Sequence, residues 1–268
     1  MTATIDPYAV EAPSRGFLAQ LSPLAKLAGP LPAMLLLIFA RDLATPAAFL
    51  GLAYVLVLAG ARLTGRIALL LFVAVPVGAA VVGLALSLWA DPARVDRSAP
   101  LLSVGDWTLY LGAVQIGLAT GLRLAAILAL GFVAGLTTTG PDLVRALVQQ
   151  LRVPYRIGYT ALAAFRFVPR FGYELEVIRQ AHRVRGAHAG RGPFAVVARW
   201  WGYIVPLLAG AIRHAERVAL AMDARAFGAH PDRTERYLLP WRRRDTVFTG
   251  ALWIASAVIL IALFPWTL

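Results

Sequence analysis

Long uninterrupted apolar runs constrain this chain more than any other feature of its sequence. Residues 67–90 and 247–264 contain no charged side chain, and residues 107–139 contain only Arg123. A helix needs about 20 apolar residues to cross the hydrocarbon core of a bilayer. These runs therefore predict membrane-spanning helices. The composition agrees, because charged residues make up 15% of the chain against about 25% in soluble domains.

Two shorter apolar segments near the N-terminus extend this pattern. Pro30 and Pro32 interrupt the first segment, and the second is short for a span. The pair is therefore expected to form a tilted or shallow hairpin. The run 107–139 is longer than one perpendicular span, so we expect it to tilt or to begin at the interface. The five expected spans are residues 21–40, 47–61, 67–90, 107–139 and 247–264.

The basic residues are concentrated in one block. Residues 141–244 contain 18 of the 26 lysine and arginine residues and 7 of the 14 acidic ones. The positive-inside rule places this block and the N-terminus in the cytoplasm, and the acidic loop 91–106 outside. Attraction to the anionic lipid bilayer accounts for the same charge. No nucleic acid partner is expected, because apolar helical stripes interrupt the basic residues.

These patterns predict an all-α integral membrane protein with about five transmembrane helices and a cytoplasmic module of long amphipathic helices. Its parts are N-terminal transmembrane helices (1–139), a cytoplasmic region (140–246) and a C-terminal transmembrane helix (247–268). The chain has no cysteine, which excludes disulfides and thiolate metal sites. All four histidines lie in the cytoplasmic region, so neither a metal site nor a cofactor is expected.

The run 107–139 carries small residues at every fourth position, among them Gly117, Gly121 and Ala125. In lipid, such ridges let two helix backbones approach closely. We expect the ridge to pack against helices of this chain, and the alternative is a docking face for a second membrane protein. Arg123 lies in the same run. A charge at membrane depth is a functional candidate, but a tilted helix would bring this one near the outer headgroups, which we favour.

The basic block predicts three helices. The first begins at Pro141, with Thr139 or Gly140 as its cap, and Asp142 complements its N-terminal dipole. Residues 153–154 (Val-Pro) end it.

Two long helices follow, and each has an apolar stripe that leads to one arginine. The first covers about residues 155–185 and ends at Arg185, with Gly186 as the expected C-cap. The second begins near Phe194 and ends at Arg225. Apolar residues recur every three or four positions in both. The stripes are Ala161, Phe165, Val168, Phe171, Leu175 and Ile178 in the first helix, and Leu208, Ile212, Ala215, Val218 and Met222 in the second.

An arginine at the end of an apolar stripe suits insertion into a groove of a partner. The flanking side chains would bury apolar area, and the guanidinium would form bidentate pairs with carboxylates. The two arginine-bearing helix ends are therefore the candidate interaction site of the chain.

Several stretches of the chain together resemble one known family. Residues 22–27 (Ser-Pro-Leu-Ala-Lys-Leu) are similar to its opening before the first span, and residues 123–143 to its exit from the membrane. Residues 165–169 (Phe-Arg-Phe-Val-Pro) resemble its Arg-Phe-(hydrophobic)-Pro signature. Most specific are two Ala-Arg-Gly motifs, which here read Val184-Arg185-Gly186 and Ala224-Arg225-Ala226. The family is the transmembrane T component of energy-coupling factor (ECF) transporters, the vitamin and metal importers of prokaryotes.

The resemblance implies a non-catalytic subunit in a prokaryotic plasma membrane. In this family, two ABC-type ATPases each receive one coupling-helix end, and the T component scaffolds a small membrane protein, the S component, that binds the vitamin or metal. Closure of the ATPases moves the coupling helices, which topples the S component and releases its substrate inside. The coupling residues implied here are Arg185, Gly186, Ala224, Arg225 and Ala226. Because Ala226 replaces the usual glycine, we expect the second helix to be capped later, at Gly228.

The residues themselves agree that ATP chemistry comes from a partner. The only lysine is Lys26, and no Gly-x-x-x-x-Gly-Lys-Ser/Thr phosphate loop surrounds it. A membrane-embedded enzyme, such as a lipid or isoprenoid transferase, is an alternative. It would depend on Asp91, Asp96 and Asp106, which lack metal-ligand spacing. Another is an ordinary ABC permease, for which one coupling helix per subunit would be expected.

Overall fold

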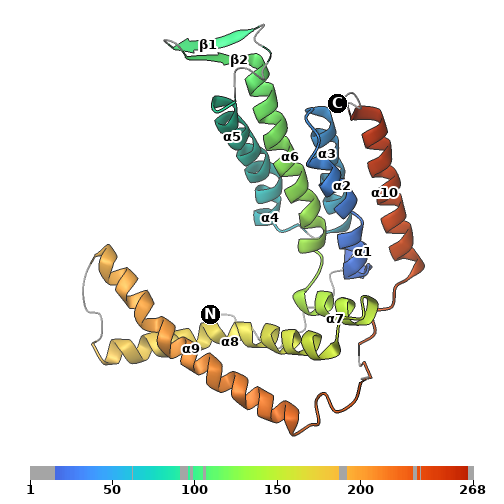
Figure 1. Cartoon of the computed structure of the whole chain (residues 1–268). Coiled ribbons are helices and arrows are strands. Elements are labelled where there is room, and N and C mark those ends of the chain that lie inside the picture. Colours follow the sequence, from blue (N-terminus) through green and yellow to red (C-terminus); the bar gives the residue numbers. More distant parts are fainter. Residues whose placement is uncertain are drawn as a thin grey trace. The chain divides into compact units, whose positions relative to one another are not determined.

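The computed structural model describes residues 16–61, 63–90, 96, 99–104, 107–186, 192–231, 234–235 and 237–264. These residues form two compact units. We call residues 16–146 and 240–264 the bundle unit and residues 147–239 the hairpin unit. Each is described by itself, with the labels of Figure 1.

The bundle unit consists mainly of apolar helices, with one small β-hairpin (Figure 1). Helix α6 lies beside both α3 and α5, and α10 contacts α1 to α3. Its elements are η1 (Leu18–Gln20), α1 (Pro23–Ala28), α2 (Leu31–Leu37), α3 (Ala44–Gly60), α4 (Gly65–Leu69), η2 (Leu70–Ala74), α5 (Val75–Leu88), β1 (Pro100–Val104), β2 (Trp107–Tyr110), α6 (Leu111–Gly135), the first part of α7 (Gly140–Gln150) and α10 (Arg243–Leu263).

Four helical segments of the described chain are long and apolar enough to cross a membrane. Three overlap predicted spans: Gly65–Leu88, Leu111–Gly135 and Arg243–Leu263. The fourth, Phe194–Asp223, lies in the block expected to be cytoplasmic. The first two predicted spans form shorter apolar helices, Pro23–Leu37 and Ala44–Gly60. The five predicted spans and the four long apolar helices therefore share three members. Two predicted spans are shorter helices, and one long apolar helix was not predicted as a span.

The segment Gly65–Leu88 crosses its proline without a break. Pro76 has no N–H to donate, and a wide π turn, η2, ends two residues before it. The N–H of Val75 closes that turn on the carbonyl of Leu70. The wider turn accommodates the proline, which cannot donate a hydrogen bond to the preceding turn. Segments α4, η2 and α5 therefore form one helical run of 24 residues.

The prediction of one helical run over 107–139 is wrong at both ends. Residues Trp107–Tyr110 form strand β2, which pairs with β1 in an antiparallel register, Val104 opposite Trp107 and Ser103 opposite Thr108. Aromatic and β-branched residues favour this extended conformation. Helix α6 begins only at Leu111 and ends at Gly135.

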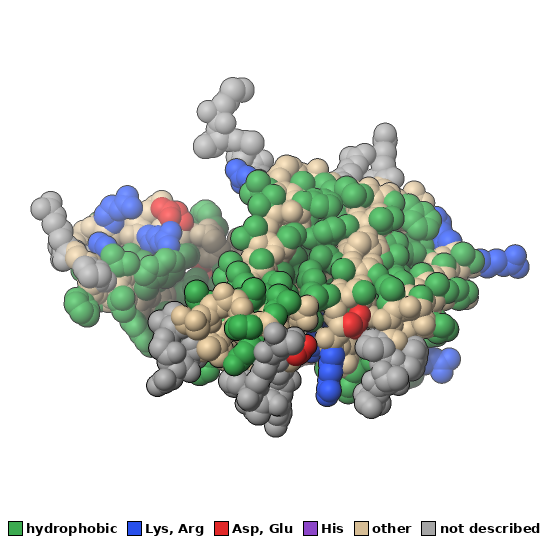
Figure 2. Space-filling view, turned by 90° about the horizontal axis from the view of Figure 1, so that it is seen from above, with side chains coloured by type: hydrophobic (Ala, Val, Ile, Leu, Met, Phe, Trp, Pro, Cys, Tyr) green, Lys and Arg blue, Asp and Glu red, His purple; other side chains and the backbone are tan. Residues whose placement is uncertain are grey.

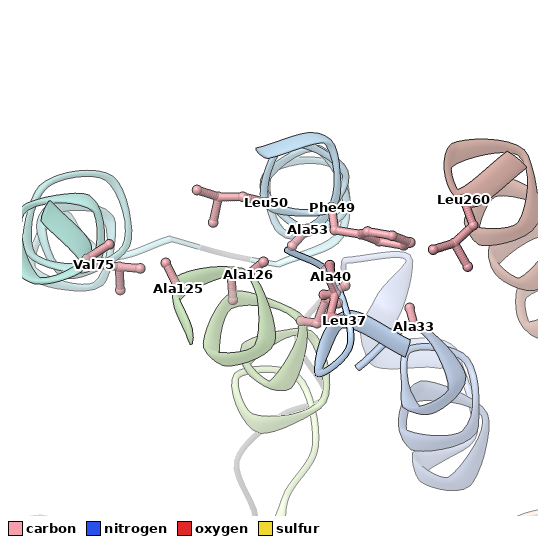
Figure 3. Close-up of a cluster of buried hydrophobic side chains, with 13 residues drawn as sticks. Ala33, Leu37, Ala40, Phe49, Leu50, Ala53, Val75, Ala125, Ala126 and Leu260 are labelled. Atoms are coloured by element: carbon pink, nitrogen blue, oxygen red, sulfur yellow. The ribbon is translucent and has the colours of Figure 1, made fainter. Parts of the chain in front are cut away.

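The largest core cluster joins α2, α3, α5, α6 and α10 (Figure 3). Phe49 of α3 is fully buried there, and Leu37, Ala126 and Leu260 come from three other helices. Between helices in lipid there is no hydrophobic driving force, so this core is stabilised by close van der Waals packing. Many members are alanines, which let the helix backbones approach closely.

The outer surface of the bundle unit remains strongly apolar. Trp89 is 90% exposed, and Val81 and Val258 are about 60% exposed. Hydrophobic side chains cover much of the face shown in Figure 2. Exposed apolar area of this extent is expected for a surface that faces lipid.

The hairpin unit contains two long helices, α8 (Tyr155–Val184) and α9 (Pro193–Asp223). Both continue through an internal proline, Pro169 in α8 and Pro206 in α9. Contacts between them run antiparallel. The ring of Phe167 stacks on His214 with centroids 4.2 Å apart, and His182 meets Tyr203 edge-on at 5.4 Å.

The predicted apolar stripe of α8 is only partly the face that contacts α9. Phe171, Leu175 and Ile178 are half-buried, but Phe165 and Val168 are exposed. Phe167 faces α9 instead. In α9, the predicted stripe residues Leu208 and Ile212 are also exposed. Both helices therefore leave apolar side chains uncovered by this chain.

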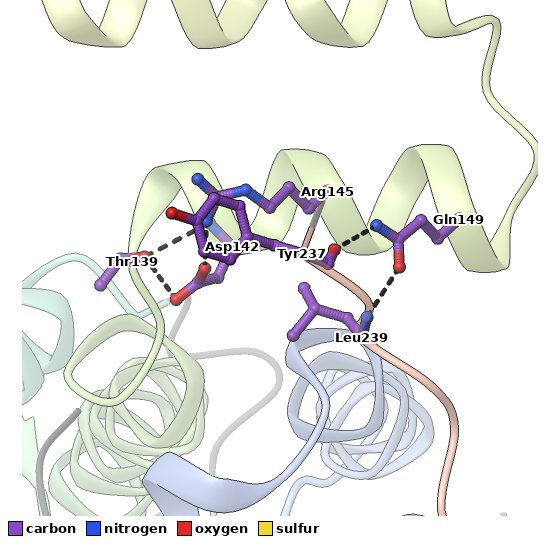
Figure 4. A network of polar contacts seen from close by, with 6 residues as sticks. All are labelled: Thr139, Asp142, Arg145, Gln149, Tyr237 and Leu239. Carbon is purple, nitrogen blue, oxygen red and sulfur yellow. Dashed lines mark hydrogen bonds and ion pairs between the residues drawn. The ribbon is translucent and has the colours of Figure 1, made fainter. Parts of the chain in front are cut away.

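Helix α7 begins at Gly140, one residue before the predicted start at Pro141, and Thr139, one of the two predicted caps, precedes it. The N–H of Leu143 donates to the carbonyl of Thr139, and the N–H of Asp142 donates to the Thr139 hydroxyl at 3.3 Å, so Thr139 is the N-cap. Arg145 Nη1 donates to Asp142 Oδ1 at 2.7 Å (Figure 4). Gly140 already belongs to the helix.

Candidate coupling site

Helix α8 ends in a tight turn that presents Arg185. The N–H of Arg185 still donates to the carbonyl of Ala181, while the N–H of Gly186 donates to Arg183 at 3.1 Å. Gly186 has a φ of +64°, in the left-handed region. A left-handed residue directly after the last helical turn is the common way to end a helix, and glycine adopts it without steric cost.

Helix α9 ends in the same way, with an alanine at the left-handed position. The N–H of Ala226 donates to Asp223 at 2.9 Å, and the N–H of Phe227 donates to Met222 at 3.0 Å. These two bonds define a Schellman motif. Ala226 has a φ of +55°. The prediction that the cap would move to Gly228 is therefore wrong, although Gly228 also has a positive φ, of +88°, in the turn that follows.

The two ends thus have alike backbones, and at the left-handed position they differ by one methyl group. Arg185 and Arg225 occupy the same position, directly before the left-handed residue. For an L-residue with a Cβ, the left-handed conformation costs roughly 1–2 kcal/mol. The second end therefore carries backbone strain that the first end lacks.

All five predicted coupling residues are exposed: Arg185, Gly186, Ala224, Arg225 and Ala226. Among the ion pairs of the described residues, none involves either arginine. A cation at a helix C-terminus is favoured by the helix dipole. Each guanidinium is therefore available to carboxylates of another protein.

The second end is held by the first turn of α8. Arg156 Nη2 donates to the carbonyl of Gly228 at 2.5 Å, and the Tyr155 hydroxyl donates to the carbonyl of His230 at 2.6 Å. The ring of Tyr155 also meets Phe227 edge-on at 5.7 Å. These contacts fix the turn that contains the strained alanine.

The chain after this turn, which we call the return segment (residues 228–231, 234–235 and 237–239), is bonded along its length. The Tyr159 hydroxyl donates to Glu235 Oε2 at 2.6 Å. Gln149 of α7 donates to the Tyr237 carbonyl at 2.7 Å and accepts from the Leu239 N–H at 2.8 Å (Figure 4). One side-chain amide thereby pairs with the backbone as a neighbouring strand would.

Sequence reasoning missed Gln149, Tyr155, Arg156 and Tyr159. They belong to no motif, and their partners lie more than 70 residues away. The one available signal was the polar pair Gln149-Gln150 at the end of an amphipathic helix, and Gln150 donates to the Leu239 carbonyl at 2.8 Å.

The small-residue ridge of α6 lies against α5. A Cβ at Gly117 would collide with the carbonyl oxygen of Gly83, and a Cβ at Gly121 with that of Ala79. Ala125 is buried in the core cluster with Val75 (Figure 3). The ridge is thus occupied by a helix of the same chain.

The remaining candidates are dispersed. Arg123 Nη1 donates to the carbonyl of Ile38 at 3.2 Å, next to the turn between α2 and α3. Of the loop aspartates on which an enzyme would depend, Asp91 and Asp106 lie outside the described residues. Within the described part of the chain, no group of three or more histidine, aspartate or glutamate side chains could hold a metal ion.

Comparison with known proteins gives the family. The chain is 34% identical over 118 residues to the energy-coupling factor transporter transmembrane protein EcfT of Thermotoga maritima. These 118 residues cover 42% of this chain and 41% of the relative. EcfT of Staphylococcus aureus is 29% identical over 164 residues, covering 58% and 61%. A third relative, from Bifidobacterium longum, bears the name of an ABC transporter ATP-binding protein. It is 30% identical over 271 residues, which cover 97% of this chain but 34% of the relative.

The chain therefore spans about a third to three fifths of the length of these curated relatives. The relatives named EcfT confirm the resemblance to the ECF T component. The family model described as "CbiQ: Cobalt transport protein" matches residues 14–236. Because this match covers most of the chain, the chain belongs to the CbiQ family of multi-pass membrane proteins.

Proposed function

We propose that this chain is the transmembrane coupling subunit of an ECF-type importer. It would bind two ABC-type ATPases through the Arg185 and Arg225 ends, and transmit their ATP-driven motion to a membrane S component that binds a vitamin or transition metal. The chain itself would be non-catalytic. The proposal rests on a single observation, the pair of alike, exposed, arginine-bearing helix ends in one chain.

The separation of the two ends supports two separate partners. The second end is held at Tyr155 and Arg156, where α8 begins, and Arg185 directly follows the last residue of α8. Helix α8 has 30 residues, which corresponds to about 45 Å of helix. That distance lets each arginine meet a different protein subunit. An ordinary permease subunit with one coupling helix would not need the second end.

The Bifidobacterium longum relative supports the nature of the partner. Nearly all of this chain matches one third of that protein, whose name describes ATP binding. The present sequence has no phosphate-binding loop. A CbiQ-like segment and an ATP-binding region therefore belong to one polypeptide in that relative, and we infer that the same association is made here between separate chains.

The charge distribution supports the orientation. Residues 141–244 carry a net charge of +11, and basic segments next to membrane helices stay in the cytoplasm. We therefore propose that the hairpin unit is cytoplasmic, where the ATPases and ATP are found, and that the protein resides in the plasma membrane.

The test is a pull-down of the tagged full-length chain from its native membranes. Wild type is compared with the double variant Arg185→Glu/Arg225→Glu. The matched control is Arg213→Glu/Arg217→Glu, which reverses two exposed arginines in the C-terminal half of α9, before its arginine-bearing end. Two ATP-binding proteins should accompany the wild type and the control, and be absent from the double variant. A small membrane protein that co-elutes would identify the substrate.

If no ATP-binding protein accompanies the wild type, the coupling function is wrong. The membrane-embedded enzyme would then be the hypothesis to test. If the control variant loses its partners as readily as the double variant, the interaction depends on overall charge, and the two helix ends have no special role.

A further inference from the structure

The only lysine of the chain is buried where two helices of the bundle unit meet. Lys26, in α1, is 2% exposed. Its ammonium group donates to the carbonyl of Thr137 at 2.7 Å. Thr137 is the second residue after α6, in the short stretch that leads into α7. Burying an ammonium group is costly unless it is bonded and its charge is balanced, so the position calls for a physical explanation.

A buried carboxylate, Asp245 in the first turn of α10, is bonded to the start of the same helix α1. It is 1% exposed. Its Oδ1 accepts from the N–H of Ser22 at 2.7 Å, and its Oδ2 from the N–H of Arg242 at 2.7 Å. Ser22 is the residue directly before α1. Asp245 therefore joins the beginning of α10 to the beginning of the helix that carries Lys26.

The second carboxylate is Asp142, in the first turn of α7. It accepts from the Thr139 hydroxyl at 2.8 Å and from Arg145 at 2.7 Å. Ser22, which is bonded to Asp245, lies one helical turn before Lys26, which is bonded to Thr137. Helix α1 is thus bonded both to the stretch that leads into α7 and to the first turn of α10, and the charges of Asp142 and Asp245 favour the ammonium form of Lys26.

These two helix starts are where the chain passes between its two units. The chain leaves the bundle unit within α7, between Ala146 and Leu147, and returns between Leu239 and Pro240. Asp142 lies just before the first passage and Asp245 just after the second. One short helix, α1, is therefore bonded beside both connections to the hairpin unit, through Lys26 at the first and Ser22 at the second.

We propose that Lys26 is a positioning residue that holds both connections to one point of the bundle unit. Movement of the hairpin unit would then be transmitted to α1 of the bundle unit through both connections at the same time. This role in transmission rests on the proposed coupling function. The local role, holding the starts of α7 and α10, does not depend on it.

The local role is tested by hydrogen exchange of the full-length protein in lipid nanodiscs. In Lys26→Met, the amides of residues 137–143 and 243–249 should both exchange roughly tenfold faster or more, because a charged hydrogen bond is lost from a buried site. Exchange in α5 should not change. The matched control is Arg66→Met, which removes a basic group from an exposed position and should leave both segments unchanged.

Faster exchange in only one segment, or an equal increase in α5, would overturn the inference. If Lys26→Met does not fold, Asp142→Asn provides the test, since it leaves the bond from Lys26 to Thr137 intact. That variant should speed exchange in 137–143 and, through Lys26, also in 243–249. No change in 243–249 would show that the two connections are independent.

The pull-down separates this inference from the proposed function. Lys26→Met should retain the ATP-binding partners that the wild type binds, because the arginine ends are unchanged. If the wild type has no such partners, the proposed function fails, while the exchange result still decides the role of Lys26. If the partners are present and exchange is unaffected, Lys26 does not hold the connections and only that inference fails.

Discussion

The two arginine-bearing helix ends share one geometry but are supported differently. Both place the arginine directly before a residue with a left-handed backbone, Gly186 in one and Ala226 in the other. Glycine adopts that conformation freely, whereas alanine does so at a cost. At the second end, Tyr155 and Arg156 donate hydrogen bonds to the residues that follow the strained turn, and these bonds support it. Arginine placement can therefore be achieved by an unstrained turn or by a strained turn held from outside.

The largest effect should come from reversing each arginine singly. If both are buried against carboxylates in the complex, Arg185→Glu and Arg225→Glu should each weaken binding of the co-eluting ATP-binding proteins by about 2–5 kcal/mol. The measurement is the dissociation constant of the purified chain with those proteins at fixed salt concentration. The two losses should be similar. An effect at only one end would break the comparison, and would show that alike backbone geometry does not mean alike contacts.

A smaller effect should follow when the external support of the second end is removed. Arg156→Ala deletes the bond to the Gly228 carbonyl, worth about 1 kcal/mol. Hydrogen exchange should become faster in residues 224–230, and stay unchanged at residues 183–186. Arg217→Ala is the matched control, because that arginine is exposed within α9, before the turn that ends the helix. Equal changes at both ends would contradict a support that is specific to the second.

Exchanging the two left-handed residues should give opposite signs. Ala226→Gly relieves about 1–2 kcal/mol of steric cost and loses about 0.5–1 kcal/mol through the extra freedom of glycine. The net gain in stability is therefore about 0.5–1 kcal/mol. Gly186→Ala should lose a similar amount by the same reasoning. Thermal melting of the two variants beside the wild type measures both. A loss of stability in Ala226→Gly would mean that the alanine methyl group makes a favourable contact that outweighs the strain.

The sequence predicted these helix ends better than it predicted their surroundings. Periodic apolar residues located α8 and α9, and the following Gly186 located one cap. The other cap was misplaced, because alanine gives no local signal for a left-handed backbone. Its support comes from Tyr155 and Arg156, which lie more than 70 residues away in sequence. Contacts at that separation follow from tertiary packing, which residue periodicity does not encode.

The bundle unit shows the same limit at a smaller scale. Residues 107–110 read as the start of an apolar helix, but pairing with residues 100–104 makes them a strand. Hydropathy cannot separate the two, since a short apolar run suits either conformation. The ridge at Gly117 and Gly121 was recognised correctly as a close-packing surface, whereas α5 as its partner could be learned only from the structure.

The smallest effect should isolate one hydrogen bond of the second end. Tyr155→Phe removes the hydroxyl that donates to the His230 carbonyl, and keeps the ring that meets Phe227. The loss should be about 0.5–1 kcal/mol, and hydrogen exchange should become faster around residues 228–231 only. Combining it with Ala226→Gly should restore much of the lost protection, because relaxing the strained turn reduces the need for support. Simple additivity of the two changes would show that the strain at Ala226 and the bonds from α8 are not coupled.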